Sequence, residues 1–372
     1  MLIVSSDNKQ VPEMNKVIEI SSIFTVIVDK KSRKTRYFLL AIALFLATLI
    51  GSFIMYTAYK NFLTSETLAG KNLCILQFLN GFSVINVYFC LIFVCDWKRF
   101  VEFKEIWSQT GLQNDPETIS SIKSQVRNYR RFICALNAVF TFTATLSIYQ
   151  SDLSFKPKDV FQSIFVTCVS FIYSFLFGLI TDFPIQMVLF ICSVFVRVNQ
   201  RLAYLIKHPD SAEDNMKSIR LLHCIGSQLT RAADQFIRYF LATSYALKVS
   251  FILINLYRII YLSETLSDYF ISLSLLIAVS SMTAFVTYNA VKVNNLASKG
   301  FHDTYRLSFT KNCPNYFAEA SLLMYRMGRN DIGLTFANLF TITASFVTSL
   351  TTLCITLILA FPTIQSQVNK QC

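Results

Sequence analysis

The chain has 372 residues, of which 53% are hydrophobic and only 15% are charged, and its formal net charge is +12. Soluble globular domains usually have about a quarter of their residues charged, so this composition excludes an ordinary soluble protein. Its apolar stretches approach or exceed the roughly 20 residues that a membrane-crossing helix needs. The sequence therefore predicts an all-α, polytopic membrane protein built as a helical bundle.

Seven long apolar stretches are expected to cross the membrane, and the chain reads as a single domain over residues 1–372. In chain order the expected spans are 37–58, 73–95, 132–149, 160–180, 239–257, 269–291 and 332–361. The segments that connect them on one side are short, so no separate domain is expected there to bind a ligand. A ligand has to enter the bundle itself.

The basic residues fall into alternate connecting segments. One alternating set holds 27 of the 34 lysines and arginines, the other set holds 6, and Lys248 lies inside a span. Because cytoplasmic segments carry the excess of basic residues, we expect a multi-pass plasma-membrane protein with a cytoplasmic N-terminus and an extracellular C-terminus. The anionic inner leaflet explains the positive charge better than a nucleic acid does.

Apolar periodicity continues beyond the membrane in the second half of the chain. Residues 160–196 contain a single charge, Asp182, and one helix of that length is longer than the bilayer is thick. Apolar helical faces that project into water need partners. We therefore expect cytoplasmic helical extensions at about 181–238 and 292–331 that pack together as an anchor region, through which subunits associate.

The sequence shows no arrangement of residues for catalysis or for holding a metal or cofactor. The three histidines, His208, His223 and His302, are not paired at ligand spacing, and there is no glycine-rich phosphate loop or nucleophile beside a base. We therefore expect no enzymatic activity, no cofactor, no metal site and no nucleic-acid partner.

Polar side chains within the spans are the candidates for binding a ligand. Lys248 lies near the middle of its span, where a cation costs roughly 2.5 to 3.5 kcal/mol, so it is expected to face the bundle interior or water. Its role is either a polar contact for a ligand or a permeation path, or an internal hydrogen bond to helix carbonyls. Converging amides, hydroxyls and aromatic rings suit a small-molecule pocket, although each one alone also suits helix packing. The full candidate set is Gln77, Asn80, Thr145, Tyr149, Gln162, Tyr173, Lys248, Asn255, Tyr257 and Tyr269.

The last span carries a hydroxyl stripe. Thr341, Ser345, Thr348, Thr352 and Thr356 recur at intervals of three or four residues, which places them along one face of a helix. An apolar face with Leu350, Leu357 and Phe361 lies roughly opposite. Either face is compatible with lining water, because small hydroxyl residues also serve close helix contacts.

The chain resembles the insect-type gustatory receptors, which belong with insect odorant receptors to one seven-transmembrane chemoreceptor superfamily. The resemblance covers the whole length and rests on the inverted topology, the RVNQRL stretch at 197–202 and the MGRNDIGL stretch at 327–334 before a Ser/Thr-rich last span. The family signature near the C-terminus is Thr-Tyr, five apolar residues, then Gln-Phe. With Phe361 as its last residue, this chain has Ala360, Cys354 and Leu353 at the other three positions.

This resemblance implies a ligand-gated cation channel that senses a small-molecule tastant, built either as a homotetramer or as a heterotetramer with a co-receptor subunit. It places four copies of the last span around the pore, with Leu357 and Phe361 as gate candidates and the hydroxyl stripe packed against neighbouring helices. Because Ala360 replaces the family's glutamine, we expect this pore to close mainly by apolar occlusion.

Other functions remain open at this point. A secondary transporter would show broken helices and paired repeats, and a divergent relative with a light-sensing or non-sensory role would share the fold. A G-protein-coupled receptor is disfavoured by the charge pattern.

Overall fold

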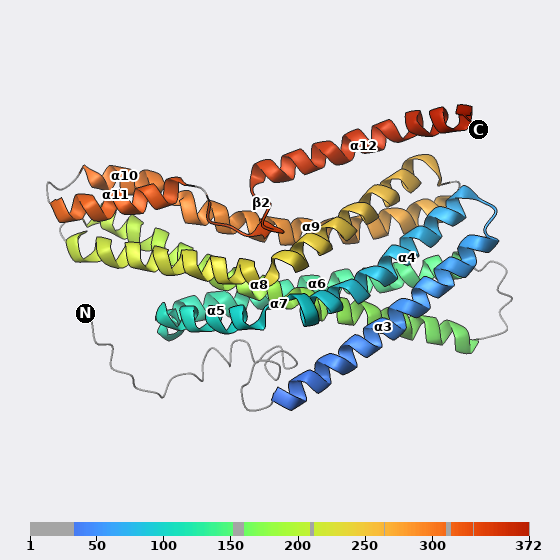
Figure 1. The fold of residues 1–372 in the computed structure, drawn as a ribbon, viewed down its shortest axis with the longest axis horizontal. Coiled ribbons are helices and arrows are strands. Elements are labelled where there is room, and N and C mark those ends of the chain that lie inside the picture. Colours follow the sequence, from blue (N-terminus) through green and yellow to red (C-terminus); the bar gives the residue numbers. More distant parts are fainter. Residues whose placement is uncertain are drawn as a thin grey trace.

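A computed structural model of the chain describes residues 33–151, 160–208, 212–263, 265–309, 314–329 and 331–371. It is an all-α helical bundle, as the sequence predicts, with one two-stranded hairpin (Figure 1). The helices longer than 20 residues are α3 (Arg33–Thr64), α4 (Leu68–Phe89), α6 (Pro116–Ser151), α7 (Val160–Lys207), α8 (Ala212–Tyr261), α9 (Leu266–Lys299) and α12 (Ala344–Gln371). The shorter ones are α5 (Trp97–Gln109), α10 (Phe301–Ser308), α11 (Pro314–Gly328), a π-helical turn η2 (Cys90–Val94) and a 3-10 turn η3 (Leu112–Asn114).

Two helices run far beyond the thickness of a membrane. α7 has 48 residues and α8 has 50, which correspond to about 72 and 75 Å at 1.5 Å per residue. α7 continues through Pro184 without a break. The second half of α7 and the first half of α8 lie with α10 and α11 at one end of the molecule, which we call the anchor end; the opposite end, where α3 turns into α4 and α8 into α9, is the short-loop end (Figure 1).

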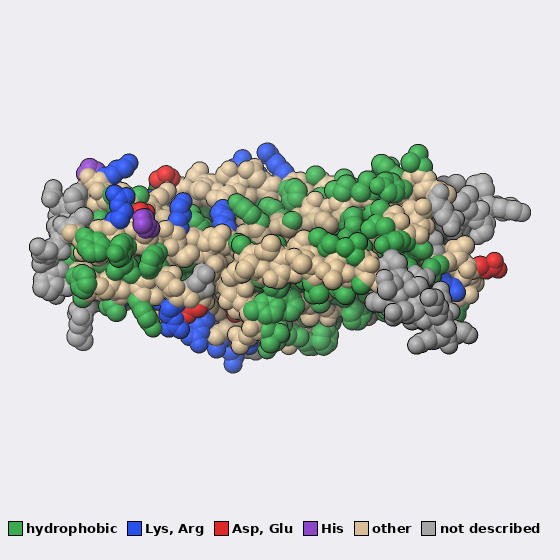
Figure 2. Space-filling view, turned by 90° about the horizontal axis from the view of Figure 1, so that it is seen from above, with side chains coloured by type: hydrophobic (Ala, Val, Ile, Leu, Met, Phe, Trp, Pro, Cys, Tyr) green, Lys and Arg blue, Asp and Glu red, His purple; other side chains and the backbone are tan. Residues whose placement is uncertain are grey.

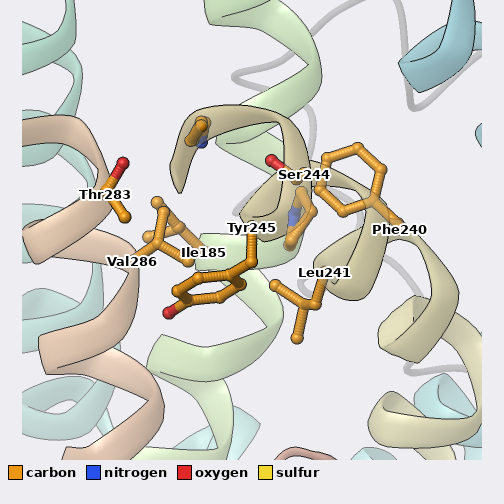
Figure 3. Close-up of a pocket in the computed structure, with 9 residues that line it drawn as sticks. Ile185, Phe240, Leu241, Ser244, Tyr245, Thr283 and Val286 are labelled. Atoms are coloured by element: carbon orange, nitrogen blue, oxygen red, sulfur yellow. The ribbon is translucent and has the colours of Figure 1, made fainter. Parts of the chain in front are cut away.

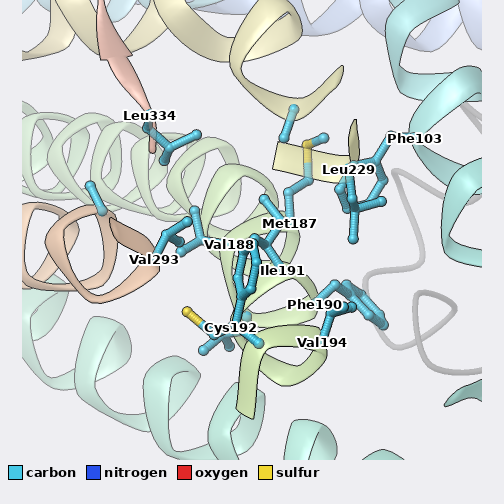
Figure 4. Close-up of a cluster of buried hydrophobic side chains, with 14 of the residues drawn as sticks. Phe103, Met187, Val188, Phe190, Ile191, Cys192, Val194, Leu229, Val293 and Leu334 are labelled. Carbon is cyan, nitrogen blue, oxygen red and sulfur yellow. The ribbon is translucent and has the colours of Figure 1, made fainter. Parts of the chain in front are cut away.

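The largest hydrophobic core lies where the extension of α7 is surrounded by other helices. Figure 4 shows Phe190, Ile191 and Val194 of α7 among Phe103 of α5, Leu229 of α8 and Val293 of α9. Ile191 and Val194 are completely buried, and the ring of Trp107 packs edge-on against Phe190 at a centroid distance of 4.8 Å. The apolar residues of this extension therefore find protein partners within the same chain.

Polar side chains also tie the anchor helices together. Asn199 of α7 donates from Nδ2 to the carbonyl oxygen of Leu296 at 2.9 Å, and Nε2 of His223 pairs with the carbonyl oxygen of Ala297 at 3.1 Å. Arg220 of α8 forms an ion pair with Glu319 of α11. Because each of these contacts joins different helices, they fix the helices in register with one another.

The surface separates into a basic part and an apolar part. Figure 2 shows most lysines and arginines of this face over the anchor half of the molecule, whereas hydrophobic side chains predominate over the other half and form smaller patches on the anchor half. Four helical segments among the described residues are long and apolar enough to cross a membrane, namely Gly70–Val94, Pro184–Lys207, Asn215–Tyr261 and Asp268–Ser308. This distribution is typical of a membrane protein whose apolar half lies in the lipid bilayer and whose basic half lies in water.

Glycines allow α3 and α4 to cross closely. A methyl group added at Gly51 would lie 2.8 Å from the carbonyl oxygen of Gly81, and one added at Gly81 would lie 2.7 Å from the carbonyl oxygen of Gly51. Close backbone approach through small residues is a common basis of helix association in membranes. The turn that follows α3 is then closed by Thr67, whose hydroxyl caps α4 by accepting from the N–H of Gly70 at 3.1 Å.

The last expected span, 332–361, differs from the structure at its start. Residues 335–341 form a hairpin in which β1 (Thr335–Phe336) pairs antiparallel with β2 (Phe340–Thr341), and the helix begins only at Ala344. Ala337 and Asn338 in the turn have positive φ angles of 50° and 65°, a conformation that asparagine tolerates better than other side chains. Thr341 is therefore in a strand and does not belong to the helical hydroxyl stripe.

Candidate functional site

A small cavity lies in the middle of the bundle between α7, α8 and α9 (Figure 3). Its lining residues are Pro184, Ile185, Phe240, Leu241, Ser244, Tyr245, Lys248, Thr283 and Val286. It offers about 20 Å³ of space to a water molecule, enough for roughly one water. Small-molecule pockets usually have about 300 to 1,000 Å³, so a ligand could occupy this cavity only if its walls moved apart.

Lys248 is the charged residue of this cavity. Its side chain is 8% exposed and points into the bundle, not toward the lipid-facing surface. Ser244, one turn earlier on α8, and Thr283 of α9 add hydroxyl groups to the same cavity. An ionisable residue inside a membrane bundle is costly and marks a functional position by default.

Tyr245 forms the wall between this cavity and the hairpin. Its hydroxyl oxygen lies 2.6 Å from Oγ1 of Thr287, and its ring packs edge-on against Phe336 of the hairpin at a centroid distance of 6.4 Å. Phe336 in turn stacks on Phe340 at 5.2 Å, and Phe340 contacts Phe346 of α12 at 4.7 Å. A continuous series of ring contacts therefore joins the cavity to the start of the last helix.

The hairpin is also fixed to α8 by hydrogen bonds. The carboxylate of Asp234, which is 7% exposed, accepts from the backbone N–H of Thr335 at 2.6 Å and from its hydroxyl at 2.9 Å. On the side of α9, Asn294 donates to the carbonyl oxygen of Ile332 at 3.0 Å. The segment that leads into α12 is thus held by both α8 and α9.

A second group of polar side chains is buried near the short-loop end. Arg258 of α8 donates from Nη2 to Oδ1 of Asp268 at 3.0 Å, and Asp268 also accepts from the hydroxyl of Thr265 at 2.7 Å. One turn deeper, Asn255 donates to the carbonyl oxygen of Ser272 at 3.0 Å. Asn255 and Ser272 are completely buried and Arg258 is 3% exposed. We call Asn255, Arg258, Asp268 and Ser272 the polar layer.

The structure distributes the sequence-predicted ligand residues over several places. Lys248 lines the cavity and Asn255 belongs to the polar layer, seven residues and about 10 Å further along α8. Gln77 and Asn80 are half-buried on α4, and Tyr257 is half-buried with its ring 5.2 Å from that of Tyr261. Tyr269 is 44% exposed at the surface. The side chains of Thr145, Tyr149, Gln162 and Tyr173 lie outside the described residues.

Several residues of these two sites were not among the sequence-based candidates. Arg258 lies three residues after Asn255, so a helix that continued beyond Tyr257 would have placed both on one face. Ser244 lies four residues before Lys248 and is related to it in the same way. Tyr245, Thr283 and Ser272 carry no comparable signal, because only the packing of α8 against α9 brings them together.

The proposed pore helix α12 stands apart from the other helices and touches the bundle mainly at α8 (Figure 1). Its bundle-facing stripe includes Ile358, which is 8% exposed, and the half-buried Leu350 and Cys354. Leu357 is 41% exposed at the edge of this stripe and Ala360 is half-buried, whereas the side chain of Phe361 lies outside the described residues. Thr348, Thr352 and Thr356 are exposed, and each hydroxyl donates to the carbonyl oxygen four residues earlier.

Comparison with solved structures shows what this arrangement resembles. The structure of the insect olfactory receptor OR5 from Machilis hrabei matches with a TM-score of 0.65 at 11% sequence identity, covering 94% of this chain and 97% of that chain. The chain has the fold of an insect olfactory receptor. The same receptor in complex with eugenol matches with a TM-score of 0.60 at 10% identity, covering 95% of this chain and 98% of that chain. No protein-family model and no curated protein matches the sequence.

Proposed function

We propose that the chain is a subunit of a ligand-gated cation channel in the plasma membrane that senses a small-molecule tastant. The observation that carries this proposal is α12. A helix that stands apart from the bundle of its own chain, with Leu353, Ile355 and Leu359 more than half exposed, is suited to contact with other copies of itself. Four copies would surround a central pore.

The anchor end supplies a second surface for association of subunits. Phe309, which directly follows α10, and Phe317 and Tyr325 of α11 are 70%, 56% and 68% exposed. Exposed apolar patches of this kind mark interaction sites. In this proposal the anchor joins four identical chains, or this chain and a co-receptor, on the cytoplasmic side, and the N-terminus lies on the same side.

The bundle offers two places to recognise a ligand. The relative with a TM-score of 0.60 was solved in complex with eugenol, which supports a small organic molecule as the ligand of this chain. The cavity at Lys248 is joined by ring contacts to the hairpin before α12. Movement of Tyr245 by a ligand would therefore reach the pore helix directly, and Leu357, Ala360 and Phe361 would form its narrow part.

Expression of the chain alone in a non-neuronal cell, with current recording over a panel of sugars, bitter compounds and amino acids, tests this function. We expect a cation current in response to at least one compound. Tags at the two termini are read on intact cells, where the C-terminal tag should be accessible and the N-terminal tag should not. Saturable uptake of a compound without current would instead indicate a transporter, and an accessible N-terminal tag would exclude the proposed orientation.

A further inference from the structure

The polar layer contains buried polar atoms that have no hydrogen-bond partner among the described residues. These atoms are Nε and Nη1 of Arg258, Oδ1 of Asn255 and Oγ of Ser272. Each unpaired buried group costs about 1 to 3 kcal/mol, and four of them in one layer would be a large fraction of the stability of a folded domain. A hydrogen-bonding partner that is not part of the protein would remove this cost.

Buried residues surround the polar layer on the side of the bundle interior, whereas the side chain of Asp268 is 25% exposed towards the short-loop end. Towards the middle of the molecule lies a separate apolar cluster formed by Leu76, Phe251, Ile271 and Leu275, all of which are buried. Helix α4 packs beside the layer, where it contributes the buried Cys74 and Leu76. One turn before Leu76 on α4, the amide oxygen of Asn72 is also buried and has no hydrogen-bond partner within the described part of the chain. The layer is therefore bounded by apolar side chains towards the middle of the molecule, and helices α4, α8 and α9 contribute its polar atoms.

The free atoms determine which chemical group fits. Arg258 offers N–H donors, while Asn255 offers an acceptor and the Ser272 hydroxyl can act as either. A carboxylate would pair with Arg258 but would leave the amide oxygen unsatisfied and approach the negative charge of Asp268. An ammonium group would satisfy the amide oxygen but would approach the positive charge of Arg258. Of these three groups, only the hydroxyl both accepts and donates, so it satisfies both kinds of atom.

We propose that the polar layer is a subsite for the hydroxyl group of a small neutral alcohol, phenol or polyol. Because Arg258 and Asp268 neutralise each other, the site favours an uncharged ligand. A trapped water presents the same chemistry and occupies the subsite when no ligand is bound. This proposal rests on the proposed chemoreceptor function only for the statement that the hydroxyl belongs to a sensed ligand. It is distinct from the cavity at Lys248, which lies seven residues before Asn255 on α8 and about 10 Å away.

The first test is the thermal unfolding midpoint of the purified full-length chain with Ser272→Ala. If the Ser272 hydroxyl bonds to a water or ligand oxygen, its removal leaves that oxygen without one partner and we expect the midpoint to fall by roughly 2 °C or more. If the hydroxyl truly has no partner, its removal leaves the midpoint unchanged or raises it, and the proposal is overturned. Ser274→Ala is the control on the same helix, because within the described residues that hydroxyl bonds to the carbonyl oxygen of Phe270. If Ser272→Ala does not fold, the unfolding midpoint of Asn72→Leu is measured instead, and the same decrease is expected because this variant removes a buried polar group contributed by α4.

The second test distinguishes a ligand from trapped water. Propane-1,2-diol, glycerol and eugenol are each compared with their O-methylated counterparts for the shift that they produce in the unfolding midpoint. We expect at least one hydroxyl compound to stabilise the unmodified chain more than its methyl ether does, and Ser272→Ala to abolish that difference. Equal shifts for every pair leave a trapped water only and overturn the ligand assignment. Because unfolding requires no channel activity, this outcome is independent of whether currents are observed.

Discussion

The backbone N–H of Thr335 donates to the carboxylate of Asp234 over 2.6 Å, and the Thr335 side chain adds a second hydrogen bond to the same carboxylate at 2.9 Å. Asp234 is in the middle of α8, whereas Thr335 is the first residue of the hairpin that leads into α12. This pair therefore fixes the start of the proposed pore helix to the helix that also carries Lys248 and Arg258.

Replacing Asp234 by alanine should loosen the hairpin. The substitution leaves a buried backbone N–H without its acceptor, so we expect a loss of about 1 to 3 kcal/mol in stability, measured as a lower thermal unfolding midpoint. Asp234→Asn is the control, because it keeps one acceptor oxygen and should lose less. Equal losses for the two variants would show that the charge of Asp234, and not its hydrogen bonds, stabilises the hairpin.

Replacing Gly51 by valine should separate α3 from α4. The new side chain would meet the carbonyl oxygen of Gly81 at 2.8 Å, and overpacking of this kind costs about 1 to 3 kcal/mol. Ala41→Val on the same helix introduces the same side chain at an exposed position and should have little effect on the unfolding midpoint. A similar decrease in both variants would mean that the β-branched residue weakens α3 itself, and that the crossing is not tight.

The helices could be predicted because their determinants are local. Long apolar stretches between polar segments predict the seven long helices. The apolar stretch over residues 160–196 is longer than the bilayer is thick, which indicates a helix that continues beyond the membrane. The hairpin was missed because Ile332 to Phe361 reads as one apolar stretch, in which only Gly333 and Asn338 favour a turn. Contacts with Asp234 and Asn294, far apart in sequence from the hairpin, hold these residues out of the helix.

The candidate site was predicted only in part. Lys248 and Asn255 were identified because a buried cation and amide are rare within spans. The sequence predicts Arg258 outside the membrane, since a span ending at Tyr257 already has the length that a membrane requires. The cavity and the ring contacts of Tyr245 depend on the distance between helices. This distance cannot be predicted from the residue pattern within a single helix.

The junction between η3 and α6 should become weaker in acid. Asp115 accepts from the hydroxyl of Thr118 at 2.7 Å and lies 3.5 Å from Arg197, and these contacts, the hydrogen bond first, lower the pKa of its carboxyl group. Because the folded pKa is below the unfolded value of about 3.9, the stabilisation is complete above that pH and is lost as the pH falls through the folded pKa.

The measurement is the thermal unfolding midpoint of the unmodified chain and of Asp115→Asn between about pH 7 and about pH 3. The variant should be less stable near neutral pH, and the difference should shrink at the acid end. A difference that stays constant over this range would show that Asp115 acts only through the shape of its side chain.

Lys248→Met should separate ligand response from stability. Methionine has a similar length and does not have to be desolvated as a cation, so we expect an equal or higher unfolding midpoint. If Lys248 contacts the ligand, the concentration that gives half-maximal current should rise by about tenfold, which corresponds to roughly 1.4 kcal/mol. Lys217→Met makes the same change at an exposed position of α8 and should leave the current unaltered. An unchanged response to ligand in both variants would remove Lys248 from the ligand site.

Leu357→Ala and Leu359→Ala test which face of α12 closes the pore. Leu357 adjoins the bundle-facing stripe, whereas Leu359 is 69% exposed on the same side as Thr348 and Thr352. If Leu357 occludes the pore with Phe361, its truncation should raise the ligand-independent current several-fold, and truncation of Leu359 should not. The reverse result would place the hydroxyl face of α12 along the ion path.

The continuity of α8 has a mechanical consequence. One unbroken helix of 50 residues carries four of the features described above. They are the polar layer, the cavity at Lys248, the hydrogen bonds of Asp234 with Thr335, and the ion pair of Arg220 with Glu319 of α11. A rod of about 75 Å that tilts by one degree displaces its far end by about 1.3 Å. In the proposed channel, a ligand that repositions the short-loop end of α8 by a fraction of a side-chain width would therefore move the hairpin and the proposed subunit contacts together, with the helix serving as the lever.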